Sequence, residues 1–137
     1  MKLIEIKGDL FTKENMQDKN IYLAHCISRD CEMGLGIAKT FDKKFPNMKN
    51  ALKNRITNMT VYTLYDDKVF NLITKNKYWQ KPTYISLENS LKDMATSCKL
   101  LNVKILVIVV LSIVVLLIIA AIKFNFLKKF EFKLEKS

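Results

Sequence analysis

The sequence has 137 residues, of which half are hydrophobic and 26% are charged, enough for one domain with a modest core. Lys and Arg number 23 against 13 Asp and Glu, so the formal net charge is +10. This charge favours anionic partners such as phosphorylated ligands, nucleic acid or anionic lipid, without choosing among them. The three cysteines, Cys26, Cys31 and Cys98, exclude a disulfide framework and fit a reducing compartment. Because no cluster of further ligands accompanies Cys26 and His25, we expect no metal site and no cofactor.

The first quarter of the chain predicts two strands. Lys2 to Lys7 alternates apolar and charged residues and ends at Gly8-Asp9, which is typical of a strand followed by a turn. Thr12 to Asn20 is polar and predicts a short surface connection. The apolar run Ile21 to Ile27 predicts a strand that is buried on both faces of a sheet.

A glycine-containing loop follows this second strand. Ser28 to Glu32 is polar, Met33-Gly34-Leu35-Gly36 comes next, and apolar residues then recur at helical spacing through Phe45. A strand, a glycine loop and a helix in this order aim backbone N–H groups at an anion such as a phosphate. Glycine suits such a loop because a Cβ would block both the turn and the close approach of a ligand. An ordinary loop is the alternative.

The middle of the chain predicts a helix and a hairpin. Pro46 ends the preceding helix, and Asn47 is placed to cap the next one, which carries Met48, Ala51, Leu52 and Ile56 on one face.

Two strands, Val61 to Tyr65 and Lys68 to Thr74, then flank Asp66-Asp67 and predict a hairpin. Lys75 follows directly. The polar loop Asn76 to Lys81 contains Tyr78 and Trp79, which either stack on a base or ribose or pack against the domain.

Pro82-Thr83 opens the longest predicted helix. Its apolar residues recur three and four apart and form one stripe, with Tyr84 and Met94 assigned to the core. Strands that alternate with helices in this way predict an α/β domain. The stripe consists of Tyr84, Leu87, Leu91, Met94, Cys98 and Leu101.

Four blocks of the sequence resemble successive blocks of a macrodomain, and the terminal ADP-ribose protein glycohydrolase group is the branch that they resemble. They follow the family's order and spacing over Leu3 to about Lys104. The resemblance implies a mixed sheet with flanking helices. The blocks are Lys7-Gly8-Asp9-Leu10-Phe11, Leu23-Ala24-His25-Cys26-Ile27-Ser28 with Asp30-Cys31, Met33-Gly34 and Gly36-Ile37-Ala38, then Leu72-Ile73-Thr74-Lys75, and Lys81-Pro82-Thr83-Tyr84.

The resemblance also implies a ligand and a chemistry. The ligand would be ADP-ribose or an ADP-ribosylated acidic side chain, with Asp9 on the adenine amino group. Lys75 aligns with the family's nucleophilic lysine, which attacks the anomeric carbon of the distal ribose and must be neutral to do so. The implied binding residues are Asp9, Leu10, Ser28, Met33, Gly34, Leu35, Gly36 and Ile37.

From residue 105 the resemblance stops. Ile105 to Ile122 is an uncharged apolar run of 18 residues, long enough as a helix to approach the thickness of a bilayer core. Its beginning, Ile105 to Val110, could be one strand, but the whole run exceeds a strand's length. We therefore predict a domain over residues 1–104, a transmembrane helix over 105–122 and a basic aromatic tail over 123–137.

This division predicts what the protein has lost. The family carries a strand, a second glycine-rich phosphate loop and a catalytic Asp where the apolar run stands, and no glycine follows Gly36. We therefore expect hydrolysis to be impaired. Either the C-terminal third of the family's domain has been replaced, or the reading frame was lost near residue 105. The location predicted is a single-pass membrane protein with its first domain in the cytosol, because Met1 to Lys7 lacks the apolar core of a signal peptide. If the apolar run is instead buried in the domain, we expect the protein in the cytoplasm or nucleus. A small membrane-anchored scaffold is the alternative function, and nucleic-acid binding ranks last.

Overall fold

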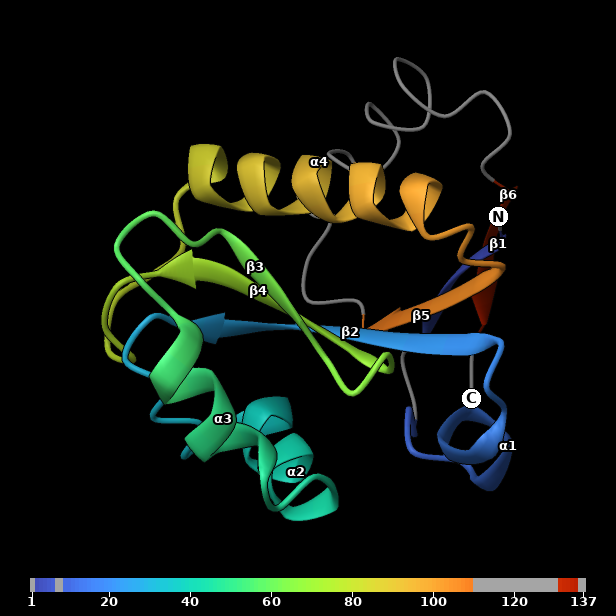
Figure 1. The fold of residues 1–137 in the computed structure, drawn as a ribbon, viewed down its shortest axis with the longest axis horizontal. Helices are drawn as coiled ribbons and strands as arrows, with labels where there is room; N and C mark the ends of the chain where they lie inside the picture. The colour runs from blue at the N-terminus through green and yellow to red at the C-terminus, as the bar shows by residue number, and fades with distance from the viewer. Residues whose placement is uncertain (1, 7–8, 110–130, 136–137) are drawn as a thin grey trace.

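The computed structural model describes residues 2–6, 9–109 and 131–135. They form a six-stranded mixed sheet in the order β3-β4-β2-β5-β1-β6, with α4 on one face and α1, α2 and α3 on the other (Figure 1). The elements are β1 (Lys2–Ile6), α1 (Lys13–Gln17), β2 (Ile21–Ser28), α2 (Gly36–Lys44), α3 (Met48–Arg55), β3 (Tyr62–Tyr65), β4 (Val69–Lys75), α4 (Tyr84–Leu100), β5 (Ile105–Val109) and β6 (Glu131–Glu135).

Strand β2 runs through the middle of this sheet. It pairs in parallel with β4 on one side and with β5 on the other. Leu23 and Ile27 face the cluster beneath α2 and α3, whereas Ala24 faces the cluster beneath α4. Burial on both faces explains why its sequence is a continuous apolar run, and the predicted strand is confirmed.

The predicted hairpin is also confirmed. Strands β3 and β4 are antiparallel and pair from Tyr62 opposite Leu72 to Tyr65 opposite Val69. Asp66 and Asp67 both have a left-handed backbone, with φ of 54° and 46°, as a two-residue hairpin turn with matching twist requires.

Helix α1 was not predicted. Thr12 starts it, because the Thr12 side chain accepts a hydrogen bond from the Asn15 N–H at 3.1 Å. The predicted cap of α3 is wrong in its detail, since the side chain of Asn47 makes no capping hydrogen bond.

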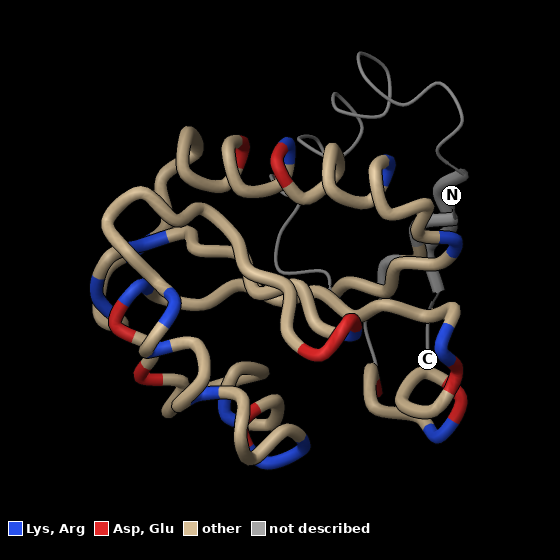
Figure 2. Tube along the Cα trace, in the orientation of Figure 1, with Lys and Arg blue, Asp and Glu red and all other residues tan. Residues whose placement is uncertain are grey.

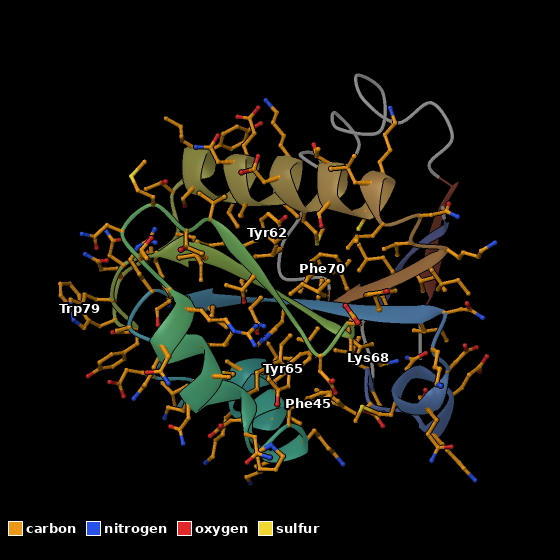
Figure 3. All side chains as sticks on the ribbon, in the orientation of Figure 1. Phe45, Tyr62, Tyr65, Lys68, Phe70 and Trp79 are labelled. Carbon is orange, nitrogen blue, oxygen red and sulfur yellow. The ribbon has the colours of Figure 1, made fainter. Side chains whose placement is uncertain are left out.

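Helix α4 confirms the apolar stripe in its middle but not at its ends. Leu91, Met94 and Cys98 are buried against the sheet, with Phe70 and Tyr62 beneath them (Figure 3). In contrast, Tyr84 is 56% exposed and is not the core residue that the spacing predicts. Tyr84 is the first residue of the helix.

The helix predicted for Ile105–Ile122 is wrong for its first five residues. Ile105–Val109 is strand β5, which lies between β1 and β2 and pairs in parallel with both. An internal parallel strand and a buried helix have similar apolar sequences, so periodicity does not separate them. Residues 110–122 lie outside the described part of the chain, and within it no helix is both long and apolar enough to cross a bilayer. In the predicted tail, Glu131–Glu135 is β6 and pairs in parallel with β1.

Candidate functional site

A cavity of about 370 Å³ lies where β2 and β4 end. Parallel neighbours place their carboxyl ends at one edge of a sheet, where α/β proteins bind ligands. The cavity joins seven of the residues predicted from the sequence, namely Ser28, the loop Met33 to Ile37 and Lys75. It is lined by Cys26, Ile27, Ser28, Glu32, Met33, Gly34, Leu35, Gly36, Ile37, Ala38, Lys75 and Tyr78.

The loop between β2 and α2 has a strained backbone. Cys31, Met33 and Gly36 have φ of 55°, 48° and 61°, and such a conformation costs a residue with a side chain about 1 kcal/mol. Cys31 and Met33 are buried, so packing against the core holds the loop in this shape. Strain that the surroundings maintain is typical of binding sites.

The two glycines of this loop differ. Gly36 is left-handed, so its own conformation favours glycine. Gly34 is not, and a Cβ added there would meet only the carbonyl oxygen of Glu32, at 4.0 Å. The protein alone therefore does not require glycine at position 34, whereas a ligand that approaches the backbone closely would.

Helix α2 starts at the cavity without a side-chain cap. Leu35 is its N-cap residue and makes no capping hydrogen bond. The N–H groups of a first helical turn have no partner inside the helix, and together with the helix dipole they attract anions. Because Gly36, Ile37 and Ala38 line the cavity, this helix start can receive a phosphate group.

Lys75 is the last residue of β4. Its Nζ donates a hydrogen bond to the backbone oxygen of Tyr78 at 2.8 Å, and its own carbonyl oxygen accepts one from the Arg29 N–H at 2.8 Å. Within the described ranges no carboxylate forms an ion pair with Lys75. The lysine is therefore positioned by backbone contacts alone.

The sequence did not reveal the role of Asp30, although Asp30 belongs to a resembling block. Its carboxylate accepts hydrogen bonds from the Ser28 hydroxyl, from the Tyr78 N–H at 3.1 Å and from the Glu32 N–H at 3.4 Å. Burial alone would raise the pKa of Asp30, but these bonds and nearby Lys77 outweigh burial and lower it. Asp30 thus ties the glycine loop to the loop that holds Lys75. A carboxylate just after a buried strand was the only sequence signal for it.

Cys26 contributes an uncharged wall. Burial raises the pKa of its thiol to about 12, and the Thr74 hydroxyl and Lys75 offset only part of this rise. A thiol is nucleophilic only as the thiolate, so Cys26 lines the cavity without reactivity at neutral pH.

The two remaining predicted site residues do not line the cavity. Asp9 is exposed, and its carboxylate accepts a hydrogen bond from the Phe11 N–H at 2.9 Å. Leu10 is 1% exposed and belongs to the core cluster beneath α2 and α3. Their assignment as ligand-binding residues, with Asp9 on the adenine amino group, stays a prediction.

Comparison with known proteins shows which chains this one is similar to. No family model matches the chain. It is 40% identical to the human ADP-ribose glycohydrolase OARD1 over 99 residues, which are 71% of this chain and 62% of that protein. The macrodomain of Thermus aquaticus DarG superposes with a TM-score of 0.73 at 18% identity, over 98% of each chain. The chain belongs to the macrodomain family.

Two further relatives define how far the likeness extends. The macrodomain of Mycobacterium tuberculosis DarG has a TM-score of 0.74 at 16% identity. The superposition covers 94% of this chain and 95% of that macrodomain. An ADP-ribose 1''-phosphate phosphatase of Candida albicans is 47% identical over 45 residues, 33% of this chain and 29% of that enzyme. This macrodomain spans 62% of the length of the human glycohydrolase, so the fold and family are shared over that part.

Proposed function

We propose that this macrodomain binds ADP-ribose, free or attached to an acidic side chain, in the cavity between the glycine loop and Lys75. The observation that carries the proposal is one cavity in which an uncapped helix start, a strained glycine loop and a lysine meet. The relatives named as an ADP-ribose glycohydrolase and an ADP-ribose 1''-phosphate phosphatase support the same ligand.

The binding mode follows from the charges of the cavity. The diphosphate lies against the first N–H groups of α2, where the helix dipole favours negative charge. The distal ribose lies toward Lys75 at the end of β4. Leu35 and Tyr78, which are 79% and 55% exposed, line the same cavity and lose solvent contact when the ligand enters.

The resemblance to the terminal ADP-ribose protein glycohydrolase branch implies hydrolysis through Lys75, and we propose that this hydrolysis is impaired here. A neutral Lys75 amine would attack the anomeric carbon, forming an N–C bond while the C–O bond breaks and its electron pair leaves with the carboxylate. Water must then release the sugar, and each step needs a group that moves protons. Two observations support impairment: no carboxylate pairs with Lys75 among the described residues, and no glycine follows Gly36 to build a second phosphate loop.

Calorimetric titration of the full chain with ADP-ribose tests binding. We expect saturable heat in wild type and at least about tenfold weaker affinity in Gly34→Val, which puts a side chain where the diphosphate would lie. The unfolding midpoint of Gly34→Val should stay close to that of wild type, because the backbone at position 34 is not left-handed and an added Cβ meets only the Glu32 carbonyl oxygen, at 4.0 Å. A folded wild-type sample that gives no heat at millimolar ADP-ribose would contradict the proposal.

Release of ADP-ribose from a glutamate-modified protein tests the chemistry. We expect little or no turnover in wild type and in Lys75→Ala alike. Robust wild-type turnover that disappears in Lys75→Ala would show that the lysine is active and that the proposed impairment is wrong.

The membrane location stays a prediction. Because β5 takes Ile105–Val109 into the sheet, the apolar residues that follow, Val110 to Ile122, number 13, fewer than the roughly 17 to 25 that a spanning helix needs. Carbonate extraction of membranes tests it, since an integral protein stays in the pellet.

A further inference from the structure

A second cavity of about 580 Å³ adjoins the first at the same end of the sheet. Its walls come from the end of β4, the loop that follows and the start of α4. Lys75 lines both cavities, so a ligand atom held beside Lys75 is next to both.

The second cavity is basic. Arg29, Lys75 and Lys81 line it, and no Asp or Glu is among its lining residues. The Arg29 guanidinium donates to the backbone oxygens of Thr57 and Thr60, both at 2.6 Å, and to the side chain of Asn76 at 3.0 Å. None of these acceptors is a carboxylate, so Arg29 is fixed in place and forms no ion pair among the described residues. Such a cavity favours an anionic occupant.

Trp79 supplies an exposed aromatic surface beside these charges. It is 71% exposed and projects from the loop at this end of the sheet (Figure 3). A large exposed aromatic beside a cavity is typical of a binding surface, because its burial on binding is favourable. The amide side chains of Asn76 and Gln80 line the same cavity and can donate hydrogen bonds to carboxylates or peptide oxygens.

We propose that this second cavity holds the acidic polypeptide segment to which the ADP-ribose is attached; the inference rests on the function proposed above. When the distal ribose lies beside Lys75, the group attached to its anomeric carbon leaves the first cavity and enters the neighbouring one. For an ADP-ribosylated glutamate or aspartate, that group is a peptide. Acidic neighbours in this peptide meet Lys81 and Arg29, and its backbone packs on Trp79.

A peptide suits this surface better than a nucleic acid strand. A strand needs a groove of positive charge that follows successive phosphates and several stacked aromatics. Figure 2 shows Lys and Arg positions on the loops at this end of the sheet with Asp and Glu positions between them, not an unbroken basic track. Asp30 lines a third cavity beside Arg29 and Lys77, which interrupts the positive surface there.

Titrations of the full chain with three probes test this. The probes are ADP-ribose, an acidic peptide carrying ADP-ribose on one glutamate through a hydrolysis-resistant linkage, and the same peptide with its flanking glutamates changed to glutamine. We expect the acidic conjugate to bind at least about tenfold more tightly than ADP-ribose or the neutral conjugate. Lys81→Glu and Trp79→Ala should remove this advantage and change the affinity for free ADP-ribose less than about twofold.

Lys99→Glu is the matched control, because it changes the net charge equally at the far end of α4, where Lys99 is exposed. It should retain the advantage of the acidic conjugate. Equal loss in Lys99→Glu and Lys81→Glu, or no loss in Lys81→Glu, would overturn the inference while free ADP-ribose still binds. No binding of free ADP-ribose by wild type would instead overturn the proposed function, and this inference with it. An unmodified single-stranded oligonucleotide that binds more tightly than the acidic conjugate and depends on Lys81 would assign the cavity to nucleic acid.

Discussion

Helices α2 and α4 both follow the carboxyl end of a parallel strand, but their first turns are built differently. At the start of α4, the Thr83 hydroxyl accepts from the Ser86 N–H at 3.0 Å, and the Ser86 hydroxyl accepts from the Thr83 N–H at 3.1 Å. At the start of α2, Leu35 offers no such group. The first turn of α4 is capped by a side chain of the chain itself, whereas no side chain caps that of α2, which leaves it open to a ligand.

The two helices also differ in how they are anchored. Six residues of α4 are buried, whereas Phe41 is the one buried residue of α2. The Phe41 ring stacks on His25 with centroids 3.7 Å apart and meets the edge of Phe11 at 4.8 Å. Phe41 is therefore the main anchor of the ligand-facing helix, with Ile37, Ala38 and Phe45 partly buried beside it.

Removing that anchor should have the largest effect. Phe41→Ala should cost about 3 to 5 kcal/mol of unfolding free energy, because it opens a cavity beneath α2. Denaturant unfolding measures the loss, and Phe45→Ala at the C-cap of this helix is the control, since Phe45 is only half-buried and should cost less. Equal losses in the two variants would mean that α2 is anchored more broadly than the packing indicates.

Acid should weaken the same contact. Burial lowers the pKa of His25 to about 4, and its hydrogen bond to Asn71, 2.6 Å from Nε2 to Oδ1, offsets only part of this shift. The folded chain therefore keeps His25 neutral while the unfolded chain protonates near pH 6.5. The contribution of neutral His25 to the unfolding free energy is fully present above about pH 6.5. About 3 kcal/mol of it is lost as the pH falls from about 6.5 to about 4.

Denaturant unfolding between pH 7 and pH 4 measures this slope. His25 is the only histidine in the sequence, so His25→Phe should flatten the dependence in that window whatever its effect on absolute stability. The lowered pKa of Asp30 acts in the same direction but below about pH 4, where its protonation removes stability. A slope that persists in His25→Phe would exclude His25 as its source.

A capping side chain at Leu35 should stabilise the fold and weaken the affinity for ADP-ribose. Leu35→Asp should raise the unfolding free energy by about 1 kcal/mol, because its carboxylate accepts hydrogen bonds from the free N–H groups. It should weaken the affinity for ADP-ribose at least about tenfold, because the carboxylate occupies these N–H groups and repels the diphosphate. Leu35→Asn should stabilise similarly but weaken binding less, since it caps without charge. Leu35 is 79% exposed, so little packing is lost in either variant. Unchanged affinity for ADP-ribose in Leu35→Asp would show that the ligand does not bind at the start of α2.

The sequence predicts local elements well and long-range ones poorly in this protein. Asp66-Asp67 fixes the hairpin and Thr83 the start of α4, because both act on neighbouring residues. Ile105–Val109 was assigned to a helix because the whole apolar run to Ile122 is too long for one strand, although a strand over Ile105 to Val110 was open. The long-range pairing with β1 and β2 decides between the two. Asp30 shows the same limit at the site, since its bond to the Tyr78 N–H joins residues 48 apart. The cavity residues were predicted through family resemblance, and the chain's own spacing left the glycine loop open to another interpretation.

The smallest expected effect is at the start of α4. Thr83→Ala should lower the unfolding free energy by about 1 kcal/mol, because it leaves the Ser86 N–H without its acceptor, while the affinity for free ADP-ribose stays unchanged. Thr96→Ala is the matched control: Thr96 is exposed within α4 and donates only to the Lys92 carbonyl, so alanine should cost less than about 0.5 kcal/mol or stabilise the helix slightly. If Thr83→Ala instead weakened the affinity for ADP-ribose as strongly as Leu35→Asp, both helix starts would contribute to ligand binding. The contrast between a capped and an open first turn would then not explain where the anion binds.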